Sequence, residues 1–330
     1  MQRRDFLKTA AILGAIASLP TRLLASERET LKVGYLPTLS CDSHLWIGLH
    51  HKVWEDQGLE IKPIQFITGL EAYQALSGGS VDLVTTGAVN ANFPARGQGK
   101  VFLVNALETD MTQIYVAADA GIKTLQDLKG KKVATTRGTS AHYLLHQALK
   151  SVGLDSSRDV EIIHQRMDQA VTSFVAGSIP VVALWTPFDS VVRTHRPSAV
   201  RLTSAAEHPE AVVVDAWSAR NALHASNPEL LQRFARGWDQ ANEHLVNEPE
   251  AALELLAAGP YKQYSVDELK EQYRVVRWEH SADWLGQYRD GSLTRHLNAV
   301  TRFNQEVGGI DNPIWADDYF DPSIFIKTFG

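Results

Sequence analysis

The chain has 330 residues, 44% of them hydrophobic and 21% charged, so it can bury a sizeable core, which excludes intrinsic disorder. Its 32 basic and 38 acidic residues give a net charge of −6, and no basic run lies beyond the N-terminus, so no nucleic-acid partner is expected. A single cysteine, Cys41, excludes an internal disulfide and a cysteine-rich metal site.

The first 25 residues have the features of an export signal. Arg3 and Arg4 precede an apolar run of about ten residues, which is too short for a membrane span of roughly 20 helical residues. This start closely resembles a twin-arginine signal, and the alternative, an amphipathic first helix, would show a polar face. We therefore expect cleavage near Ala25 and export of the folded protein to the periplasm.

Short apolar runs alternate with helical patterns, which predicts an α/β fold with largely parallel strands. The expected strands cover residues 31–35, 60–66, 81–85, 101–107, 114–117, 132–135, 160–164, 181–185, 200–202 and 211–215. The expected helices cover residues 46–57, 69–76, 124–128, 141–152, 168–176, 229–245, 249–258, 266–276 and 294–306.

The order of these elements predicts two lobes. The chain enters a self-contained α/β unit near residues 115–118 and leaves it near residues 212–217. We therefore expect lobe 1 to comprise residues 26–116 and 216–330, and lobe 2 to comprise residues 117–215. Two crossovers can act as a hinge, and the cleft between lobes is a natural place for a small ligand.

Several sequence segments resemble one family. They are Gly34-Tyr35, EDQGL at 55–59, GGSVDLVTTG at 78–87, the run 124–154 that begins TLQDLKG, and ALWTPF at 183–188. Together they resemble the periplasmic substrate-binding proteins of ABC importers, in the nitrate, sulfonate and taurine group. The resemblance implies the type II periplasmic-binding fold, a small-molecule solute as ligand, and an ABC permease with its ATPase as partners. It also implies no enzymatic activity and no cofactor, and we expect a monomer.

The best local signal for a ligand site lies between the strand at 132–135 and the helix that follows. Backbone N–H groups at a helix N-terminus bind anionic oxygens, and glycine lets the backbone approach closely. The residues concerned are Arg137, Gly138, Thr139 and Ser140. A simple helix cap is the alternative, but the resemblance implies that this turn faces the ligand.

A second turn of similar design contains Gly87, Ala88 and Asn90. Sulfonate-binding relatives typically carry a Gly-Ser-Ser turn here, so this chain lacks the hydroxyl groups while it keeps the backbone donors. The departure weakens the case for a specific sulfonate, and Asn90 is the residue that could compensate.

Asp215 and Trp217 lie at the second crossover. In taurine-binding proteins a similar Asp-x-Trp stretch places its carboxylate on the ligand ammonium. A buried carboxylate needs a partner, and the alternatives to an ammonium are a backbone cap or an arginine.

Two further segments are placed to reach the ligand. Trp185 and Phe188 follow a buried strand and could line the pocket or stack on a cation, or simply pack in the core. The first loop follows the first strand, and ligands of open α/β sheets bind at the carboxyl ends of strands. Its candidate side chains are Thr38, Ser40, Asp42 and His44.

No metal site or catalytic motif is expected. His142 and His146 have a spacing that suits zinc, but no third ligand is evident. No nucleophile elbow, P-loop or dinucleotide fingerprint is present. The sequence therefore predicts an extracytoplasmic receptor for a small organosulfonate or a zwitterion such as taurine. The alternatives are a receptor for nitrate or a thiamine-precursor-like ligand, a periplasmic sensor subunit, and an enzyme on the same fold.

Overall fold

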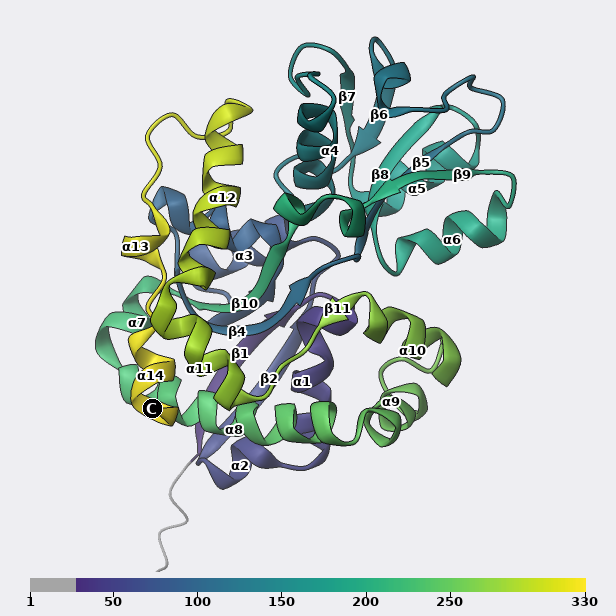
Figure 1. Cartoon of the computed structure of the whole chain (residues 1–330). Helices are drawn as coiled ribbons and strands as arrows, with labels where there is room; N and C mark the ends of the chain where they lie inside the picture. The colour runs from purple at the N-terminus through teal and green to yellow at the C-terminus, as the bar shows by residue number, and fades with distance from the viewer. Residues whose placement is uncertain (1–27) are drawn as a thin grey trace, which may run out of the picture.

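The structure is a computed structural model that describes residues 28–330, and the expected twin-arginine signal lies outside these residues. It contains two mixed sheets with helices packed around them (Figure 1). The first sheet has the order β11-β4-β10-β3-β1-β2. Its strands are β1 (Glu29–Tyr35), β2 (Leu59–Gln65), β3 (Leu83–Thr86), β4 (Lys100–Glu108), β10 (Val213–Ala219) and β11 (Val276–Arg277).

The second sheet has the order β7-β6-β8-β5-β9 and lies at the upper right of Figure 1. Its strands are β5 (Thr112–Val116), β6 (Lys132–Thr135), β7 (Glu161–His164), β8 (Val181–Trp185) and β9 (Val200–Ser204). The chain passes between the sheets twice, from β4 to β5 and from β9 to β10. The predicted α/β fold with two crossovers is therefore confirmed.

The prediction of largely parallel strands was wrong. Strand β10 runs antiparallel to β3 and β4, β11 antiparallel to β4, and β5 antiparallel to β8 and β9. A crossover helix enforces parallel pairing of consecutive strands, but none of these antiparallel pairs joins strands that are consecutive in the chain. The strands that carry the chain between the sheets are therefore free to pair in the opposite direction.

Sheet membership suggests where one lobe gives way to the other. Strand β5 pairs in the second sheet, although the expected boundaries placed residues 112–116 in lobe 1. Strand β10 pairs in the first sheet from Val213 onward. We propose that the chain passes from lobe 1 to lobe 2 within residues 109–111 and returns to lobe 1 within residues 205–212.

The helices cover both sheets and form most of the C-terminal third. Those before β10 are α1 (Leu39–His50), α2 (Val53–Asp56), α3 (Gly69–Ser77), α4 (Ser140–Ser151), α5 (Met167–Val175) and α6 (Phe188–His195), with the short 3-10 turn η1 (Ala88–Ala91). Those after β10 are α7 (Asn221–Ser226), α8 (Pro228–Asn247), α9 (Pro249–Ala258), α10 (Val266–Arg274), α11 (Ser281–Asp290), α12 (Ser292–Glu306), α13 (Ala316–Tyr319) and α14 (Ser323–Phe329). Within residues 28–330, none of the helices has the length and apolar character that a membrane crossing requires.

The first helix differs from its prediction. A single helix was expected at 46–57, but α1 begins at Leu39 and a left-handed residue, Lys52, separates it from α2. Most of the predicted first loop is therefore helical. Nine of the twelve α1 residues are buried, so the segment lacks the one-sided apolar pattern by which a surface helix is recognised.

The two lobes touch each other away from the hinge. Helix α4 of the second lobe packs beside α12 of the first (Figure 1). Glu306 on α12 lies 3.0 Å from His146 and 3.0 Å from Lys150, both on α4. Arg166, before α5, lies 3.3 Å from Glu71 on α3. Helices that pack on the two different sheets are therefore also joined by ion pairs away from the crossovers.

Candidate functional site

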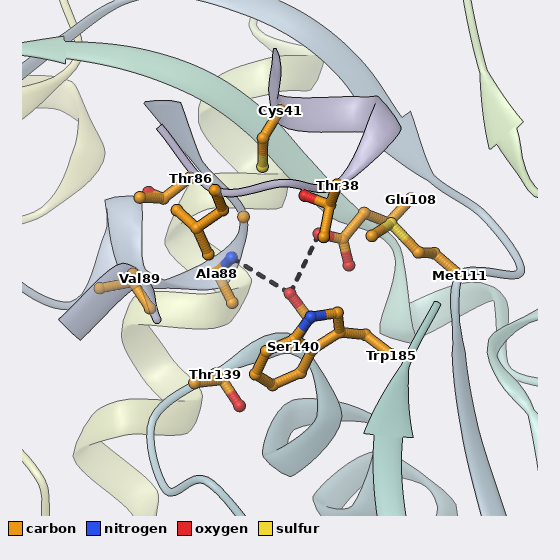
Figure 2. Close-up of a pocket in the computed structure, with 13 residues that line it drawn as sticks. Thr38, Cys41, Thr86, Ala88, Val89, Glu108, Met111, Thr139, Ser140 and Trp185 are labelled. Atoms are coloured by element: carbon orange, nitrogen blue, oxygen red, sulfur yellow. Dashed lines mark hydrogen bonds between the residues drawn. The ribbon is translucent and has the colours of Figure 1, made fainter. Parts of the chain in front are cut away.

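A small pocket lies where the two lobes meet, with about 360 Å³ of space when the part open to solvent is included. It is formed by the start of α1, the turn from β3 into η1, the end of β4, the N-terminus of α4 and the end of β8 (Figure 2). The residues that line it are Leu36, Thr38, Cys41, Gly69, Thr86, Gly87, Ala88, Val89, Glu108, Met111, Thr139, Ser140 and Trp185. Carboxyl ends of strands from both sheets therefore meet at one place, as expected of a ligand site in α/β folds.

Ser140 links the two lobes across this pocket. Its hydroxyl donates to Glu108 Oε1 at 3.1 Å and accepts from the Ala88 N–H at 3.3 Å (Figure 2). Thr139, the preceding residue, donates its hydroxyl to the Thr136 carbonyl at 2.7 Å. Both hydroxyl protons at the start of α4 are thus directed at protein acceptors.

Gly138 precedes this turn and has a positive φ of 74°. A Cβ there would lie 2.6 Å from Asn92 Nδ2, so glycine is required both for the backbone conformation and for the close approach of the two lobes. The Gly138 N–H is itself occupied, because it donates to His142 Nδ1 at 3.1 Å. His142 thus serves the turn rather than the pocket.

Two carboxyl groups are buried at the pocket. Glu108 is 3% exposed and Asp215 is fully buried. Asp215 Oδ1 accepts from the Cys41 thiol at 3.5 Å, whereas Asp215 Oδ2 and Glu108 Oε2 have no hydrogen-bond partner within residues 28–330. Burial raises the pKa of Asp215 to about 6. Burial, and then the charge of Asp215, raise the pKa of Glu108 well above its ordinary value.

Gly87 provides the space between these groups. A Cβ at Gly87 would overlap Glu108 Oε1 and would lie 2.8 Å from Ser140 Oγ and 3.1 Å from Asp215 Oδ1. The two carboxyl groups and the Ser140 hydroxyl therefore converge on one point. Glycine is the residue that leaves this point open.

Six of the predicted site residues line the pocket: Thr38, Gly87, Ala88, Thr139, Ser140 and Trp185. Asp215 lies directly behind them, and Ser40 is its neighbour on the other side, with a hydroxyl 3.3 Å from Met111 Sδ. Phe188 packs edge-on against Trp185. The structure thus brings these residues together at one end of the cleft.

The other predicted residues are engaged elsewhere. Asp42 accepts from Trp46 Nε1 at 2.9 Å and from the Tyr261 hydroxyl, and burial raises its pKa to about 8. His44 stacks on Trp238 with its Nε2 3.0 Å from Asn242 Oδ1, and burial lowers its pKa to about 4. These contacts hold α1 against the C-terminal helices.

Asn90, Arg137 and Trp217 also make protein contacts. The Asn90 amide donates to two backbone carbonyls, at 3.1 and 2.7 Å. Arg137 is exposed and donates to the Ile162 carbonyl at 3.2 Å. Trp217 is buried in the first core and donates to Asn105 Oδ1 at 2.6 Å. None of the three lines the pocket described above.

Glu108 is the site residue that sequence reasoning missed. It ends a strand in which every residue after Lys100 is buried, and it lies one residue beyond the strand expected at 101–107. The sequence feature that could have identified Glu108 is the one that identified Asp215: an acidic residue in an apolar strand, at a point where the chain changes lobes. Cys41, Thr86 and Met111 also line the pocket and carried no separate signal.

No metal centre is built by the described residues, since no group of three or more His, Cys, Asp or Glu side chains within 28–330 is arranged to hold an ion. His142 packs edge-on against Phe303. His146 contacts Ser156 at 2.9 Å and Glu306 at 3.0 Å. The two histidines therefore have structural partners of their own.

Among curated proteins, the chain is similar along its whole length to a binding protein of Brucella abortus (strain 2308), with 28% identity over 97% of this chain and 98% of the relative. An aliphatic sulfonates-binding protein of Escherichia coli is 32% identical over 57% of this chain and 59% of its own. The taurine-binding periplasmic protein of the same organism is 24% identical over 60% and 62%.

Among solved structures, the alkanesulfonate-binding protein SsuA of Xanthomonas axonopodis pv. citri, bound to MOPS, matches with a TM-score of 0.72 and 22% identity over 90% of this chain and 99% of that one. The desulfurization enzyme DSZB matches with a TM-score of 0.64 and 14% identity over 91% and 99%. Both share the fold, which therefore serves binding proteins and at least one enzyme.

The NMT1/THI5 like family model matches residues 54–252, which include the β3–η1 turn, both crossovers and the start of α4. The chain belongs to the NMT1/THI5-like family.

Proposed function

We propose that the protein is an extracytoplasmic solute receptor of an ABC importer that acts in the periplasm. It captures a small organosulfonate or a zwitterion such as taurine between its lobes and presents it to a permease and its ATPase. The names of the relatives support this class of ligand, and the fold they share supports a receptor role. Ligand binding would favour the closed state, which the permease recognises.

One observation carries the proposal: polar groups from both lobes converge on a single pocket at the crossovers. Ser140 comes from the second lobe, whereas Gly87, Glu108 and Asp215 come from strands of the first sheet or their ends. A ligand that contacts both sets is buried only when the lobes close. This is the geometry that a receptor needs to couple binding to closure.

Within the ligand class, the pocket favours a zwitterion over nitrate. Glu108 lines it, Asp215 is buried behind it, and no lysine, arginine or histidine is among its lining residues within 28–330. A bare anion would meet negative charge without a compensating cation. An ammonium group would supply that cation.

A hydrolytic enzyme on this fold is the second candidate, and Cys41 is the nucleophile it would use. The thiol lies at the pocket, but burial, and then the Asp215 charge, raise its pKa well above the ordinary value. A thiol that stays protonated is a weak nucleophile. We therefore propose that the protein is not an enzyme.

The experiment that tests the proposal is native mass spectrometry of the protein purified from its host, followed by calorimetric titration with taurine and ethanesulfonate. A co-purified small molecule, or micromolar binding of either compound, is the expected result. A position next to permease and ATPase genes would separate an importer from a sensor subunit. Absence of any bound or binding compound would contradict the receptor role.

A further inference from the structure

A second cavity lies beside the first crossover, between the two lobes. It has about 960 Å³ of space when the part open to solvent is included, and it shares no lining residue with the pocket described above. Strands β5 and β9, the end of β8 and helix α6 line it from the second lobe, and α10 lines it from the first; α6 and α10 both lie at the right of Figure 1. The lining residues are Asp110, Gln113, Tyr115, Thr186, Pro187, Asp189, Ser190, Arg193, Arg201, Tyr264, Glu268, Glu271, Gln272 and Val275.

The backbone of the crossover separates the second cavity from the first pocket. The Thr186 N–H donates to the Met111 carbonyl at 2.9 Å. Met111 and Trp185 line the first pocket, whereas their chain neighbours Asp110 and Thr186 line the second cavity. The second cavity is therefore a separate compartment with its own set of polar groups.

Three acceptor oxygens on side chains that line the second cavity have no hydrogen-bond partner within residues 28–330. They are Gln113 Oε1 on β5, Asp189 Oδ1 on α6 and Gln272 Oε1 on α10, and the three residues are only 4%, 5% and 7% exposed. The Gln113 amide is held in its orientation, because its Nε2 donates to the Asp110 carbonyl at 3.2 Å and to the Thr186 hydroxyl at 3.3 Å. Buried acceptors are costly to leave without donors, so this cavity suits a ligand rich in N–H groups.

The charges around the second cavity favour a cation among such ligands. Its four acids and two arginines give a formal charge of −2; they are Asp110, Asp189, Glu268 and Glu271, with Arg193 and Arg201. Asp189 is the buried member of this set, and both arginines are exposed to solvent. Arg193 donates to Asp189 Oδ2, which leaves Oδ1 for another donor.

Two tyrosines, one from each lobe, lie close to the same carboxylate. Tyr115 is on β5 and Tyr264 precedes α10. Burial, and then the charge of Asp189, raise the pKa of both phenol groups above the ordinary value. Aromatic rings attract cations to their faces, so these side chains add to the affinity of the cavity for a positive group.

We propose that the second cavity is a binding site for a small organic cation with three or more N–H groups, of which a guanidinium is the best match. A planar guanidinium directs several N–H groups outward in one plane and offers its face to an aromatic ring. Asp189 Oδ1 receives the charge, while Gln113 and Gln272 accept the remaining N–H groups. Because Gln272 belongs to the first lobe and the other two to the second, the bound cation bridges the lobes beside the crossover.

The test is titration of the mature protein with methylguanidinium and with urea at pH 7 and low ionic strength, followed by NMR. The two probes share a planar, N–H-rich shape and differ in charge. We expect methylguanidinium to bind at least about tenfold more tightly than urea and to shift the side-chain amide signals of Gln113 and Gln272. If urea binds as tightly, or if neither probe binds, water is sufficient for these acceptors and the inference is overturned.

Asp189→Asn removes the charge and keeps the shape of the side chain. We expect it to weaken methylguanidinium binding at least about tenfold. Asp168→Asn is the matched control, because Asp168 also lies in the first turn of a second-lobe helix and pairs with an arginine, but does not line the cavity. Equal affinity in these two variants would place the cation elsewhere and overturn the inference.

Gln272→Met keeps the test decisive if Asp189→Asn does not fold. It removes one acceptor from α10 and retains a side chain of similar length, so we expect methylguanidinium affinity to fall several-fold. Unchanged affinity in folded Gln272→Met would show that the cation does not bridge the lobes and would contradict the proposed site. The receptor role depends on the first pocket, so it stands or fails separately from these results.

Discussion

At the scale of single residues, Gly87 decides whether the pocket exists. Replacement by alanine places a methyl group against Glu108 Oε1 and near the Ser140 hydroxyl, and both contacts are with buried atoms that have little room to move. We expect Gly87→Ala to weaken ligand binding at least a hundredfold, or to prevent closure, while the protein still folds. Calorimetry and small-angle scattering would measure these effects.

Gly286→Ala is the matched control for that experiment. Gly286 lies in α11, and nothing stands within 4 Å of the Cβ it would gain. Binding should be unchanged, and stability should rise by up to about 1 kcal/mol because alanine is the better helix former. Normal affinity in Gly87→Ala would mean that the ligand does not use this pocket.

Ser140 and Thr139 should differ in their effect on binding. The Ser140 hydroxyl joins Glu108 to the Ala88 N–H across the lobes, whereas that of Thr139 closes the turn onto Thr136. A hydrogen bond between neutral groups contributes about 0.5–1.5 kcal/mol, so we expect Ser140→Ala to weaken binding by up to about tenfold. Thr139→Ala should affect affinity less, and the double variant should show at least the tenfold loss. Unchanged affinity in a folded double variant would mean that this turn only caps helix α4 and does not contribute to ligand binding.

At the scale of secondary structure, strands were easier to predict than helices. The strands at 132–135 and 181–185 match β6 and β8 to the residue, because each is a short apolar run that ends at a turn signal. Helix α1 was predicted too late, because polar side chains such as Ser40 and Asp42 are buried and paired, which removes the amphipathic pattern. Helices α6, α7, α11, α13 and α14 lie outside the predicted helical ranges.

The candidate site was predictable only in part, for a related physical reason. Turns that follow strands are visible in sequence, and those that contain Gly87 and Ser140 do reach the pocket. The pairing of Glu108 with Asp215 depends on β4 and β10 lying side by side, 107 residues apart in the chain. Nothing in the sequence near either residue indicates that these two strands pair or which of their residues lie opposite each other.

Helices α1 and α2 pack tightly on α8, and this contact can be tested by substitution. A Cβ at Gly237 on α8 would overlap the Trp54 indole, which is buried and donates to the Phe234 carbonyl at 3.0 Å. Overpacking of this kind costs about 1–3 kcal/mol, so Gly237→Ala should lower the free energy of unfolding in urea by that amount. Gly286→Ala is again the control, since it adds a methyl group to a helix at an open position. Equal stability of the two variants would contradict the tight contact.

At the scale of the whole molecule, the ion pairs between the lobes are expected to contribute little to closure. Glu306 pairs with His146 and Lys150, and Arg166 pairs with Glu71, but most of these groups are substantially exposed. Such pairs contribute only about 0–1 kcal/mol each. The buried groups at the crossovers carry larger energies, so the ligand, through these groups, is expected to determine whether the lobes remain closed.

The buried acids also set how the stability of the unliganded protein depends on pH. Burial raises the pKa of Asp42 to about 8 and that of Glu108 well above its usual range, so both keep protons that the unfolded chain has released. A folded-state pKa above the unfolded value gives stability that is lost as the pH rises towards the folded value. Burial lowers the pKa of His44 to about 4 and that of His142 to about 3. These histidines have the opposite effect on the pH dependence of stability, but only below about pH 6.5, where the unfolded chain protonates them and the folded protein does not.

We therefore expect the free energy of unfolding to fall between pH 6.5 and 8. Each acid that keeps its proton across this window contributes about 1.4 kcal/mol per pH unit. Urea unfolding at constant ionic strength, at half-unit steps of pH, measures the slope. Asp42→Asn removes one titrating group and keeps a neutral side chain of the same shape, so its slope should be about half that of the unmodified protein. A flat or rising profile would mean that Asp42 and Glu108 are ionised in the folded protein, with cations that balance them.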